Sequence, residues 1–351
     1  MWNQFNLVRL ATAFLTASSM AHPGHEEEER KSLATAGSFA DSALSVGRCS
    51  GNAEKVARRM EAAIQRHAHT QRLKKRSVDT QGNSLDKRSL ESVLGTNHHS
   101  RLRGITLDSD PRDFFTTTTC ILSPDGGIGP YYVPGEQVRR DITEDEEGVP
   151  LYIHVQFIDV HTCDPVPGVY VDVWQANSTG VYSGVQNPVN GNGRDRSNIH
   201  NTALRGIQRT DRNGVVMFDS IFPGMYYGRA AHIHVLAHSE ATRLPSNTVV
   251  SKYASHIGQL FFDQDLVHGI RDIYPYSTNV TDLTLNRDDD FIKMITESSE
   301  SDPVFKYVLL GDDLADGVFA WITVGIQTTS YYDIDHDFVM TENGGVALND
   351  D

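Results

Sequence analysis

The stretch NGVVMFDSIFPGMYYGRAAHIHVLA, residues 213–237, contains the signals that decide the fold of this chain. The dipeptide Asn213-Gly214 is a strong turn signal, and the apolar run 215–218 follows it directly. His232 and His234 begin a second run, in which apolar residues alternate with them. Successive side chains of a strand point to opposite faces. The stretch therefore predicts two short strands, and it places both imidazoles on one face of the second.

Further short β-type runs lie on both sides of this stretch, from about residue 106 onwards. The runs 151–158, 169–174 and 319–326 are rich in Val, Ile and aromatic residues, and Gly, Pro, Asn and Asp separate them. Many short strands with turn signals at this spacing are typical of a β-sandwich. We therefore predict an all-β fold, a β-sandwich of mixed short strands, over residues 101–330.

The N-terminal part of the 351-residue chain has a different texture. Residues 1–21 predict a secretory signal peptide, because a short apolar stretch is followed by small residues. Residues 22–100 are predicted to form a helical or flexible extension. Two basic clusters, Lys74-Lys-Arg76 and Lys87-Arg88, leave two interpretations open. A secretory-pathway protease could cut there and remove 22–88 as a pro-segment, or this segment could stay attached as a solvated helix and linker.

The opposite end of the chain and the cysteines complete this organisation. Residues 331–351 are acidic and are predicted to form a mobile tail. The three cysteines suit an oxidising compartment if Cys120 pairs with Cys163, which leaves Cys49 odd. The sequence alone does not decide this pairing.

Charge and hydropathy restrict the partners of the chain. Its formal net charge is -15 at pH 7, which argues against general nucleic-acid binding, because phosphate contacts need concentrated Lys and Arg. No apolar run reaches the roughly 18 residues of a membrane span. Two glycosylation triplets begin at Asn177 and Asn279, although a buried structural role for Asn177 is equally open. We therefore expect a secreted protein without a nucleic-acid or membrane partner.

Two tyrosines, Tyr182 and Tyr226, extend the chemistry that the histidine pair can perform. A free phenol has a pKa of about 10, so it coordinates well only to a cation that is acidic enough to remove its proton. Ferric iron is hard and highly charged and suits phenolate and imidazole together. If the two tyrosines converge with His232 and His234, they predict a non-haem Fe(III) site.

A series of motifs in a fixed order carries a resemblance to a known family. The series is Gly129-Pro-Tyr-Tyr132, Val173-Trp-Gln-Ala-Asn177, Gly180-Val-Tyr-Ser183, Arg205-Gly-Ile-Gln208, Thr210-Asp211, Pro223-Gly-Met-Tyr226, Gly228-Arg229 and His232-Ile-His234. It resembles the intradiol ring-cleavage dioxygenases, most closely the secreted fungal branch of that family. The resemblance covers about residues 105–330. A bare His-x-His pair is weak evidence, but the ordered set with both tyrosines is specific.

The resemblance implies an iron site and an activity. Tyr182, Tyr226, His232 and His234 match the ligands of one Fe(III) ion per chain. The implied substrates are a small aromatic diol and O2. The implied reaction cleaves a catechol-type ring between its two hydroxyl-bearing carbons and gives a muconate-type diacid.

The resemblance also implies roles for residues around the iron. Tyr226 matches the phenolate that the substrate displaces and that accepts one of the substrate protons. Arg229 matches a residue that stabilises negative charge on the ring, and Gln259 matches one that helps to orient it. Pro130 and Tyr131 match a segment that forms a wall of the substrate pocket.

The sequence departs from the family pattern at three places, one of which is Met225 where a polar residue is frequent, and it leaves other interpretations open. Arg229-Ala-Ala stands where Arg-Pro-Ala is usual, and Gln175-Ala176 stands where a His-Cys or His-Ala pair is common. If Cys49 normally pairs with a cysteine near Ala176, its partner is missing. A secreted β-sandwich binding module and a catalytically degenerate member that binds iron or phenols are the alternatives. The preferred catechol and the oligomeric state, which could be a dimer, are not decided.

Overall fold

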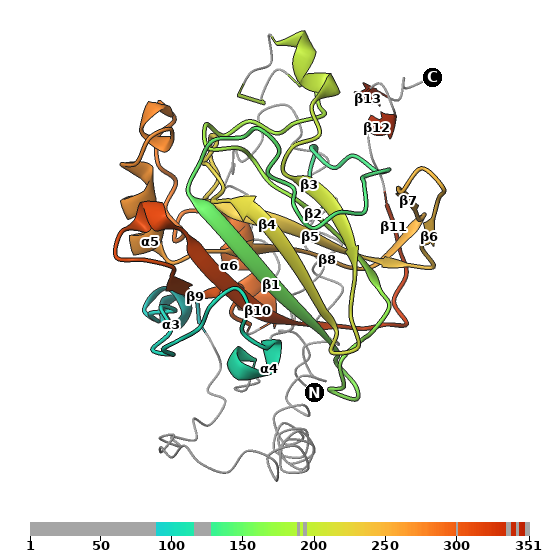
Figure 1. Cartoon of the computed structure of the whole chain (residues 1–351), viewed down its shortest axis with the longest axis horizontal. Coiled ribbons are helices and arrows are strands. Elements are labelled where there is room, and N and C mark those ends of the chain that lie inside the picture. The colour runs from blue at the N-terminus through green and yellow to red at the C-terminus, as the bar shows by residue number, and fades with distance from the viewer. Residues whose placement is uncertain are drawn as a thin grey trace, which may run out of the picture.

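The structure is a computed structural model, and it describes residues 89–115, 128–187, 190–191, 195–299, 301–334, 338–341 and 344–347 (Figure 1). The predicted signal peptide and residues 22–88 lie outside the described residues. Most of the described elements are strands, and the main ones form two sheets that pack face to face. The predicted all-β sandwich is therefore confirmed.

The first sheet has four strands in the order β4-β1-β10-β9. They are β4 (Val215–Ile221), β1 (Pro150–Asp159), β10 (Val318–Ile326) and β9 (Lys306–Leu309). The two central strands β1 and β10 run parallel, and the outer pairs are antiparallel. Every residue of β10 is buried, as its continuous apolar sequence predicts for a central strand. Three of the predicted runs thus become β1, β4 and β10.

The second sheet has five strands in the order β11-β8-β5-β2-β3, and all its pairs are antiparallel. They are β11 (Tyr332–Asp333), β8 (Tyr253–Phe261), β5 (His232–Ser239), β2 (Tyr170–Trp174) and β3 (Arg205–Arg209). In Figure 1 this sheet lies behind the sheet of β4, β1 and β10. Two small ribbons stand apart from it, β6 (Thr242–Arg243) with β7 (Val249–Val250) and β12 (Phe338–Thr341) with β13 (Gly344–Ala347).

The core between the sheets follows the period of two that the sequence predicts. Ile233, Val235 and Ala237 of β5 pack in one cluster with apolar residues of β1, β4 and β10. Each such fully buried aliphatic side chain stabilises the fold by about 1.5–3 kcal/mol. The alternate residues of β5, including His232 and His234, consequently face the outer side of the five-stranded sheet. Loops cover this side, and the candidate site lies there.

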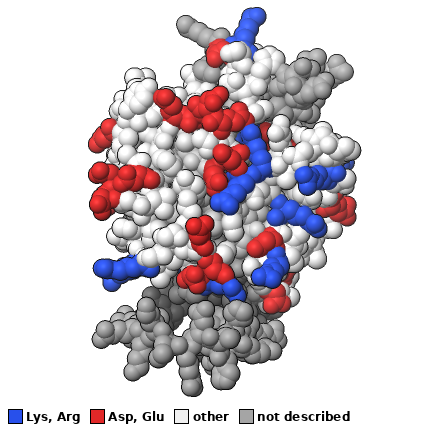
Figure 2. Space-filling view, viewed as in Figure 1, with Lys and Arg blue, Asp and Glu red and all other residues white. Residues whose placement is uncertain are grey.

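Short helices close the ends of the sandwich. They are α3 (Leu90–Leu94), α4 (Pro111–Phe114), α5 (Gln264–Arg271), α6 (Asp290–Ser299) and the 3₁₀ turns η2 (Arg196–His200), η3 (Tyr276–Thr278) and η4 (Leu314–Asp316). The helix α5 buries Leu266, Val267 and Ile270, which share one face. Within the described ranges, no helix combines the length and the apolar character that crossing a membrane requires. On the face in Figure 2, acidic and basic side chains are interspersed.

The structure moves both predicted boundaries of the sandwich outwards. Val93 of α3 packs with Phe261 and Phe291, so the end of the extension predicted as helical or flexible forms a helix that contacts the sandwich. At the other end, β11 pairs with β8, and Ile334 is buried, so the predicted mobile tail does not begin at residue 331.

One of the cysteines can be placed in the structure. Cys163 takes part in a disulfide bond. Its predicted partner Cys120, and also Cys49, lie outside the described residues. The pairing of Cys120 with Cys163 therefore stays a prediction.

Candidate metal centre

Two histidines of β5 form the base of the candidate centre. His232 and His234 are two residues apart on a strand, so their rings share the outer face of the sheet. Their Nε2 atoms lie 3.1 Å apart, and both residues are 2% exposed. The indole of Trp174, the residue of β2 that pairs with His234, stacks on this imidazole at 4.7 Å between ring centroids. The sheet therefore fixes the position of the pair and the plane of one ring.

Two loops bring the tyrosines to these histidines. Tyr182 lies in the loop after β2, and its Oη is 3.4 Å from His232 Nε2. Tyr226 lies between β4 and β5, and its Oη is 3.3 Å from the same nitrogen. Both tyrosines are buried. The structure thus brings together the four residues that the sequence predicts as ligands.

The spacing and the chemistry of these four side chains fit one metal ion. Atoms that bind one cation at about 2.0–2.1 Å lie roughly 3 Å apart from one another. The contacts of 3.1–3.4 Å around His232 Nε2 have this spacing. Among the described residues, no three His, Cys, Asp or Glu side chains gather as a metal site, so a metal held here needs the phenols.

The protonation of the donors also favours a strongly acidic cation. His232 Nδ1 lies 2.7 Å from the Ala230 carbonyl oxygen, so Nδ1 carries the donated proton and Nε2 presents its lone pair to the centre. Burial, together with the Arg229 cation, holds the pKa of His232 well below its usual value. Burial raises the pKa of Tyr182 well above the usual value for a phenol. A metal ion that binds this phenol must therefore be acidic enough to remove its proton.

Arg229 lies beside the tyrosine and is fully buried. Its Nη1 donates to Tyr226 Oη at 3.3 Å, its Nε donates to Asp289 Oδ2 at 2.9 Å, and its Nη2 donates to Gln259 Oε1. Burial alone would lower the pKa of Arg229, but the Asp289 carboxylate and the two neighbouring tyrosines together outweigh this effect and raise it. The guanidinium is therefore a permanent positive charge directed at one of the two phenols.

Gln259 lies on β8 directly opposite His234. It alternates with Leu260, which belongs to the core between the sheets, so the glutamine faces the candidate centre. Its Oε1 accepts from Arg229, whereas its fully buried Nε2 has no hydrogen-bond partner within the described part of the chain. A buried donor without a partner is costly, so this amide is suited to a bound ligand.

The segment with Pro130 and Tyr131 lies against both tyrosines. The Tyr131 ring stacks on Tyr182 at 4.6 Å between centroids and meets Tyr226 edge-on at 6.0 Å. Pro130 is buried. The structure thus places this segment where the sequence predicts a pocket wall, and its contact with substrate stays a prediction.

Asp289 and Trp174 also belong to the centre. The sequence motifs include Trp174 without giving it a role, and they do not include Asp289. Asp289 is fully buried, and its Oδ2 accepts hydrogen bonds from Arg229 Nε and from the Ala230 backbone N–H. It stands in the run Asp288-Asp-Asp290, and such a run usually indicates a solvated surface. The apolar pair that follows it, Phe291-Ile292, is the one signal that could have indicated burial.

Both asparagines of the predicted glycosylation triplets have structural roles near the tyrosines. Asn177 Oδ1 accepts from the N–H groups of Thr179 and Val181 in the turn before Tyr182. Asn279 Nδ2 donates to the carbonyl oxygen of Met225, the residue before Tyr226, at 2.7 Å. Glycosylation of either asparagine stays a prediction.

Known proteins share this arrangement of sequence and fold. Residues 128–293 match the protein family described as Dioxygenase, a range that contains the centre from Pro130 to Asp289. The chain is 29% identical over 143 residues to catechol 1,2-dioxygenase 1 of Acinetobacter lwoffii. This match covers 33% of the chain and 42% of the relative, so the chain spans less than half the length of the curated relative.

Two solved structures are similar to the sandwich. The intradiol ring-cleavage dioxygenase from Tetranychus urticae superposes with a TM-score of 0.50 at 28% identity, covering 60% of this chain and 97% of that one. The dioxygenase domain of a dioxygenase and carbohydrate-binding protein fusion from Streptomyces sp. SirexAA-E has a TM-score of 0.36 at 25% identity, covering 58% and 97%.

Proposed function

We propose that this protein is a secreted, Fe(III)-dependent dioxygenase acting on catechol-type aromatics, because residues 128–293 match the family described as Dioxygenase and the sandwich is similar to a solved intradiol ring-cleavage dioxygenase. The proposed reaction inserts both atoms of O2 between the two hydroxyl-bearing carbons and gives a muconate-type diacid. The observation that carries the proposal is the convergence of Tyr182, Tyr226, His232 and His234 on one point. The secretory signal predicted over 1–21 supports the extracellular location.

The four converging side chains would hold one Fe(III) ion. When bound, this ion would supply the Lewis acidity that ionises the phenols and makes a catechol reactive towards O2. The chain contributes a site from which water is excluded, since all four residues are buried. Charges interact more strongly in such a site than in water.

Tyr226 is placed to accept a proton from the substrate. A catechol loses hydroxyl protons when it binds as a dianion, and a phenolate is a competent base for one of them. Arg229 Nη1 lies 3.3 Å from Tyr226 Oη, so this hydroxyl keeps a cationic partner when it no longer serves as a ligand. This hydrogen bond from Arg229 therefore supports a role for Tyr226 as a ligand that the substrate can displace.

Arg229 and Gln259 provide fixed donors around the ring. The guanidinium is a permanent positive charge in a buried site, and the Gln259 Nε2 donor has no partner within the described residues. Both are suited to stabilise negative charge that develops on the substrate. Removing one such preorganised donor typically costs about 2.7–4 kcal/mol of transition-state stabilisation. We expect Gln259→Leu and Arg229→Met each to lower kcat by about 10²–10³-fold, which corresponds to this loss of free energy.

The iron content and the visible spectrum of the purified protein test the proposal. We expect about one iron per chain and a phenolate-to-Fe(III) charge-transfer band, which anaerobic catechol shifts. Tyr182→Phe should remove part of the band. Tyr227→Phe is the matched control, because Tyr227 adjoins Tyr226 in sequence but is 60% exposed, and its band should equal that of the wild type.

The same measurement separates the alternatives. A protein that stays colourless after iron loading would contradict the tyrosine ligands and would favour a β-sandwich binding module. A coloured protein that does not turn over simple catechols would indicate a degenerate member of the family. Oxygen uptake with catechol and substituted catechols then ranks the substrates of an active protein.

A further inference from the structure

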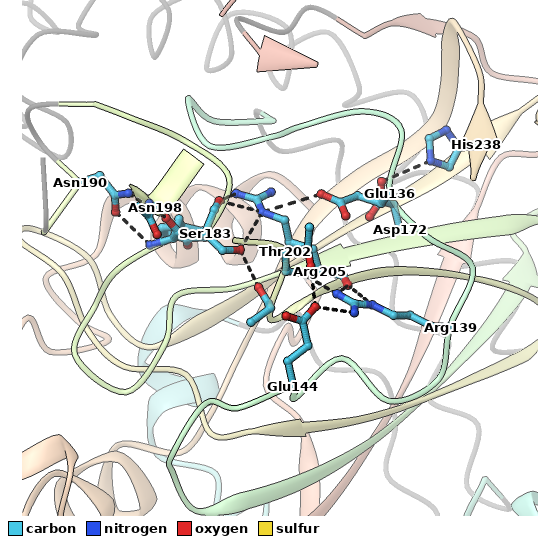
Figure 3. Close-up of polar contacts among 12 residues, drawn as sticks. Glu136, Arg139, Glu144, Asp172, Ser183, Asn190, Asn198, Thr202, Arg205 and His238 are labelled. Carbon is cyan, nitrogen blue, oxygen red and sulfur yellow. Dashed lines mark hydrogen bonds and ion pairs between the residues drawn. The ribbon is translucent and has the colours of Figure 1, made fainter. Parts of the chain in front are cut away.

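The main chain at Tyr182 is held from two sides by buried asparagines. Asn190 Oδ1 accepts from the Tyr182 N–H at 2.9 Å, and its Nδ2 donates to the Tyr182 carbonyl oxygen at 2.8 Å. Asn198 Nδ2 donates to the same carbonyl and to that of Val185, each at 2.8 Å (Figure 3). Both asparagines are 3% exposed or less. Tyr182 thus makes hydrogen bonds with side chains in a loop where it has no strand partner.

The next residue, Ser183, is held by a buried arginine. Arg205 of β3 donates to the Ser183 carbonyl oxygen through Nε at 3.0 Å and through Nη2 at 2.6 Å. The Ser183 hydroxyl donates to the Ala203 carbonyl at 2.6 Å. Arg205 is 1% exposed. Two donors of one planar fork therefore fix the carbonyl group of Ser183, the residue after Tyr182.

The surroundings of Arg205 show that its charge is directed at the Ser183 carbonyl. Its nearest carboxylate, Glu136, lies 3.8 Å from Nε, and Asp172 is a second buried carboxylate in the same group (Figure 3). The short bonds of the guanidinium go to the Ser183 carbonyl and not to these acids. Hydrogen bonds from an ionised donor are roughly twice as strong as neutral ones. Burying a cation costs several kcal/mol, so the hydrogen bonds to the Ser183 carbonyl are needed to compensate for the burial of Arg205.

The strand position of Arg205 is fixed in turn by a second arginine nearer the surface. Arg139 donates to the Arg205 carbonyl oxygen through Nε at 2.9 Å and through Nη2 at 2.8 Å. Its Nη1 binds Glu144 at 2.6 Å, and Thr202 donates to the same carboxylate oxygen at 2.6 Å. The network in Figure 3 therefore runs from Glu144 and Arg139 through Arg205 to Ser183, the residue after Tyr182.

We propose that Asn190, Asn198 and Arg205 are positioning residues that fix the main chain of Tyr182 and thereby set how its phenolate meets the metal. The inference rests on the proposed function. Its physical reason is that the two histidines are fixed by a sheet, whereas Tyr182 lies in a loop. Side-chain partners that hold a metal ligand typically change metal affinity or activity by about 10–100-fold when they are removed.

The experiment compares iron binding and the visible spectrum of full-length variants. Asn198→Ala removes one of the two side-chain donors to the Tyr182 carbonyl, and Arg205→Met removes the charged fork with little change in length. We expect both to bind iron about 10–100-fold more weakly. The absorbance per bound iron should fall towards that of Tyr182→Phe, and kcat should fall more than KM changes. Arg205→Lys keeps one charged donor and should restore part of the band.

Arg209→Met is the matched control. Arg209 is on the same strand and also donates to a carbonyl, that of Gly168, but it is exposed. Its spectrum should equal that of the wild type. The unfolding midpoint of each metal-free variant separates positioning from stability, and if Arg205→Met does not fold, Asn198→Ala and Arg205→Lys decide the question.

Two outcomes would overturn the inference, and they are distinguishable. If the wild type shows the charge-transfer band and each bound iron in Asn198→Ala and Arg205→Met absorbs as in the wild type, the network serves stability alone. If the wild type itself binds iron without colour, the proposed function fails, and the role in metal positioning fails with it.

Discussion

At the scale of single residues, Asp289 holds the Arg229 guanidinium in its position beside Tyr226. It is fully buried, and its Oδ2 accepts from Arg229 Nε and from the Ala230 N–H, both at 2.9 Å. A buried ion pair gives little net stability compared with apolar residues, but removing one partner leaves an uncompensated charge. Asp289 therefore matters both for folding and for the direction of Arg229.

Replacing this carboxylate should be costly. We predict that Asp289→Asn lowers the free energy of unfolding by roughly 3–5 kcal/mol, because the Arg229 cation loses its only close counter-charge within the described residues. Urea unfolding monitored by tryptophan fluorescence measures the change. Asp288→Asn is the control, because Asp288 is exposed and should alter stability by less than about 0.5 kcal/mol. Equal effects of the two changes would contradict the buried pairing.

At the scale of elements, the loops of the two tyrosines are built against each other. Gly180 has a φ of +85°, and a Cβ placed on it would lie 2.1 Å from the Met225 carbonyl oxygen. That carbonyl also accepts from Asn279. The turn before Tyr182 therefore packs on the residue before Tyr226, and only glycine permits the approach.

A pair of glycine substitutions isolates this close approach. Gly104 has a similar φ of +74°, but a Cβ there would meet nothing within 4 Å. Both Gly→Ala changes carry the backbone strain of a positive φ, and only Gly180→Ala adds the clash. We predict that Gly180→Ala is about 1–3 kcal/mol more destabilising than Gly104→Ala and also lowers iron uptake. Equal unfolding midpoints for the two variants would show that the loops do not depend on each other.

The buried side chain of His98 links the segment that follows α3 to two carboxylates of the sandwich. His98 Nδ1 lies 2.5 Å from Asp263 Oδ1, and its Nε2 lies 3.0 Å from Asp302 Oδ2. Burial alone would lower the pKa of His98, but the hydrogen bonds and the charges of the two carboxylates outweigh it and raise the pKa to about 9. The imidazolium is therefore part of the folded state at neutral pH.

This ion triad makes stability dependent on pH. Because the folded pKa lies above the unfolded value of about 6.5, the contribution is complete below pH 6.5 and is lost as the pH rises through about 9. We predict that the wild type loses roughly 3 kcal/mol more than His98→Gln between pH 6.5 and 9.5. Urea titrations at a series of pH values measure the difference. Parallel curves for the two proteins would show that His98 is not charged in the fold.

At the scale of the whole molecule, the folded unit begins before residue 101. Val93 is buried against the sandwich, and His98 binds two carboxylates of other elements. We predict that a chain starting at Arg101 is less stable than one starting at Ser89 by at least about 3 kcal/mol. The reason is that it loses an apolar contact and leaves Asp263 and Asp302 without their shared cation. Denaturant midpoints of the two chains at pH 6.5 measure this, and equal midpoints would restore the boundary at residue 100.

Much of the sandwich could be predicted because its strands have local signals. The alternation of Ile233, Val235 and Ala237 with the two histidines requires no tertiary information, and the structure confirms it. The tail was predicted less well, because Tyr332–Asp333 is too short to show a strand pattern. Its pairing with Tyr253 and Ala254 depends on the edge of β8 being available.

The sequence could predict the four proposed metal ligands of the candidate centre, but not the residues that hold these ligands in position. Tyr182, Tyr226, His232 and His234 stand out because phenol and imidazole are unusual together and because their motifs occur in order. Asp289 has no such signal, since an aspartate in an acidic run has the same sequence whether it is solvated or buried. The asparagines and Arg205 that hold the Tyr182 loop are equally common residue types in surface loops.

The sequence by itself therefore determined the properties that depend on neighbours along the chain. These are the strands, the faces on which their side chains lie, and the chemistry of the four proposed ligands. Only the tertiary structure decided which distant groups meet: Gln259 opposite His234, Asp289 on Arg229, and Arg205 on the carbonyl of Ser183. The physical reason is that these contacts depend on strand register and loop packing, which are set by the burial of the whole core.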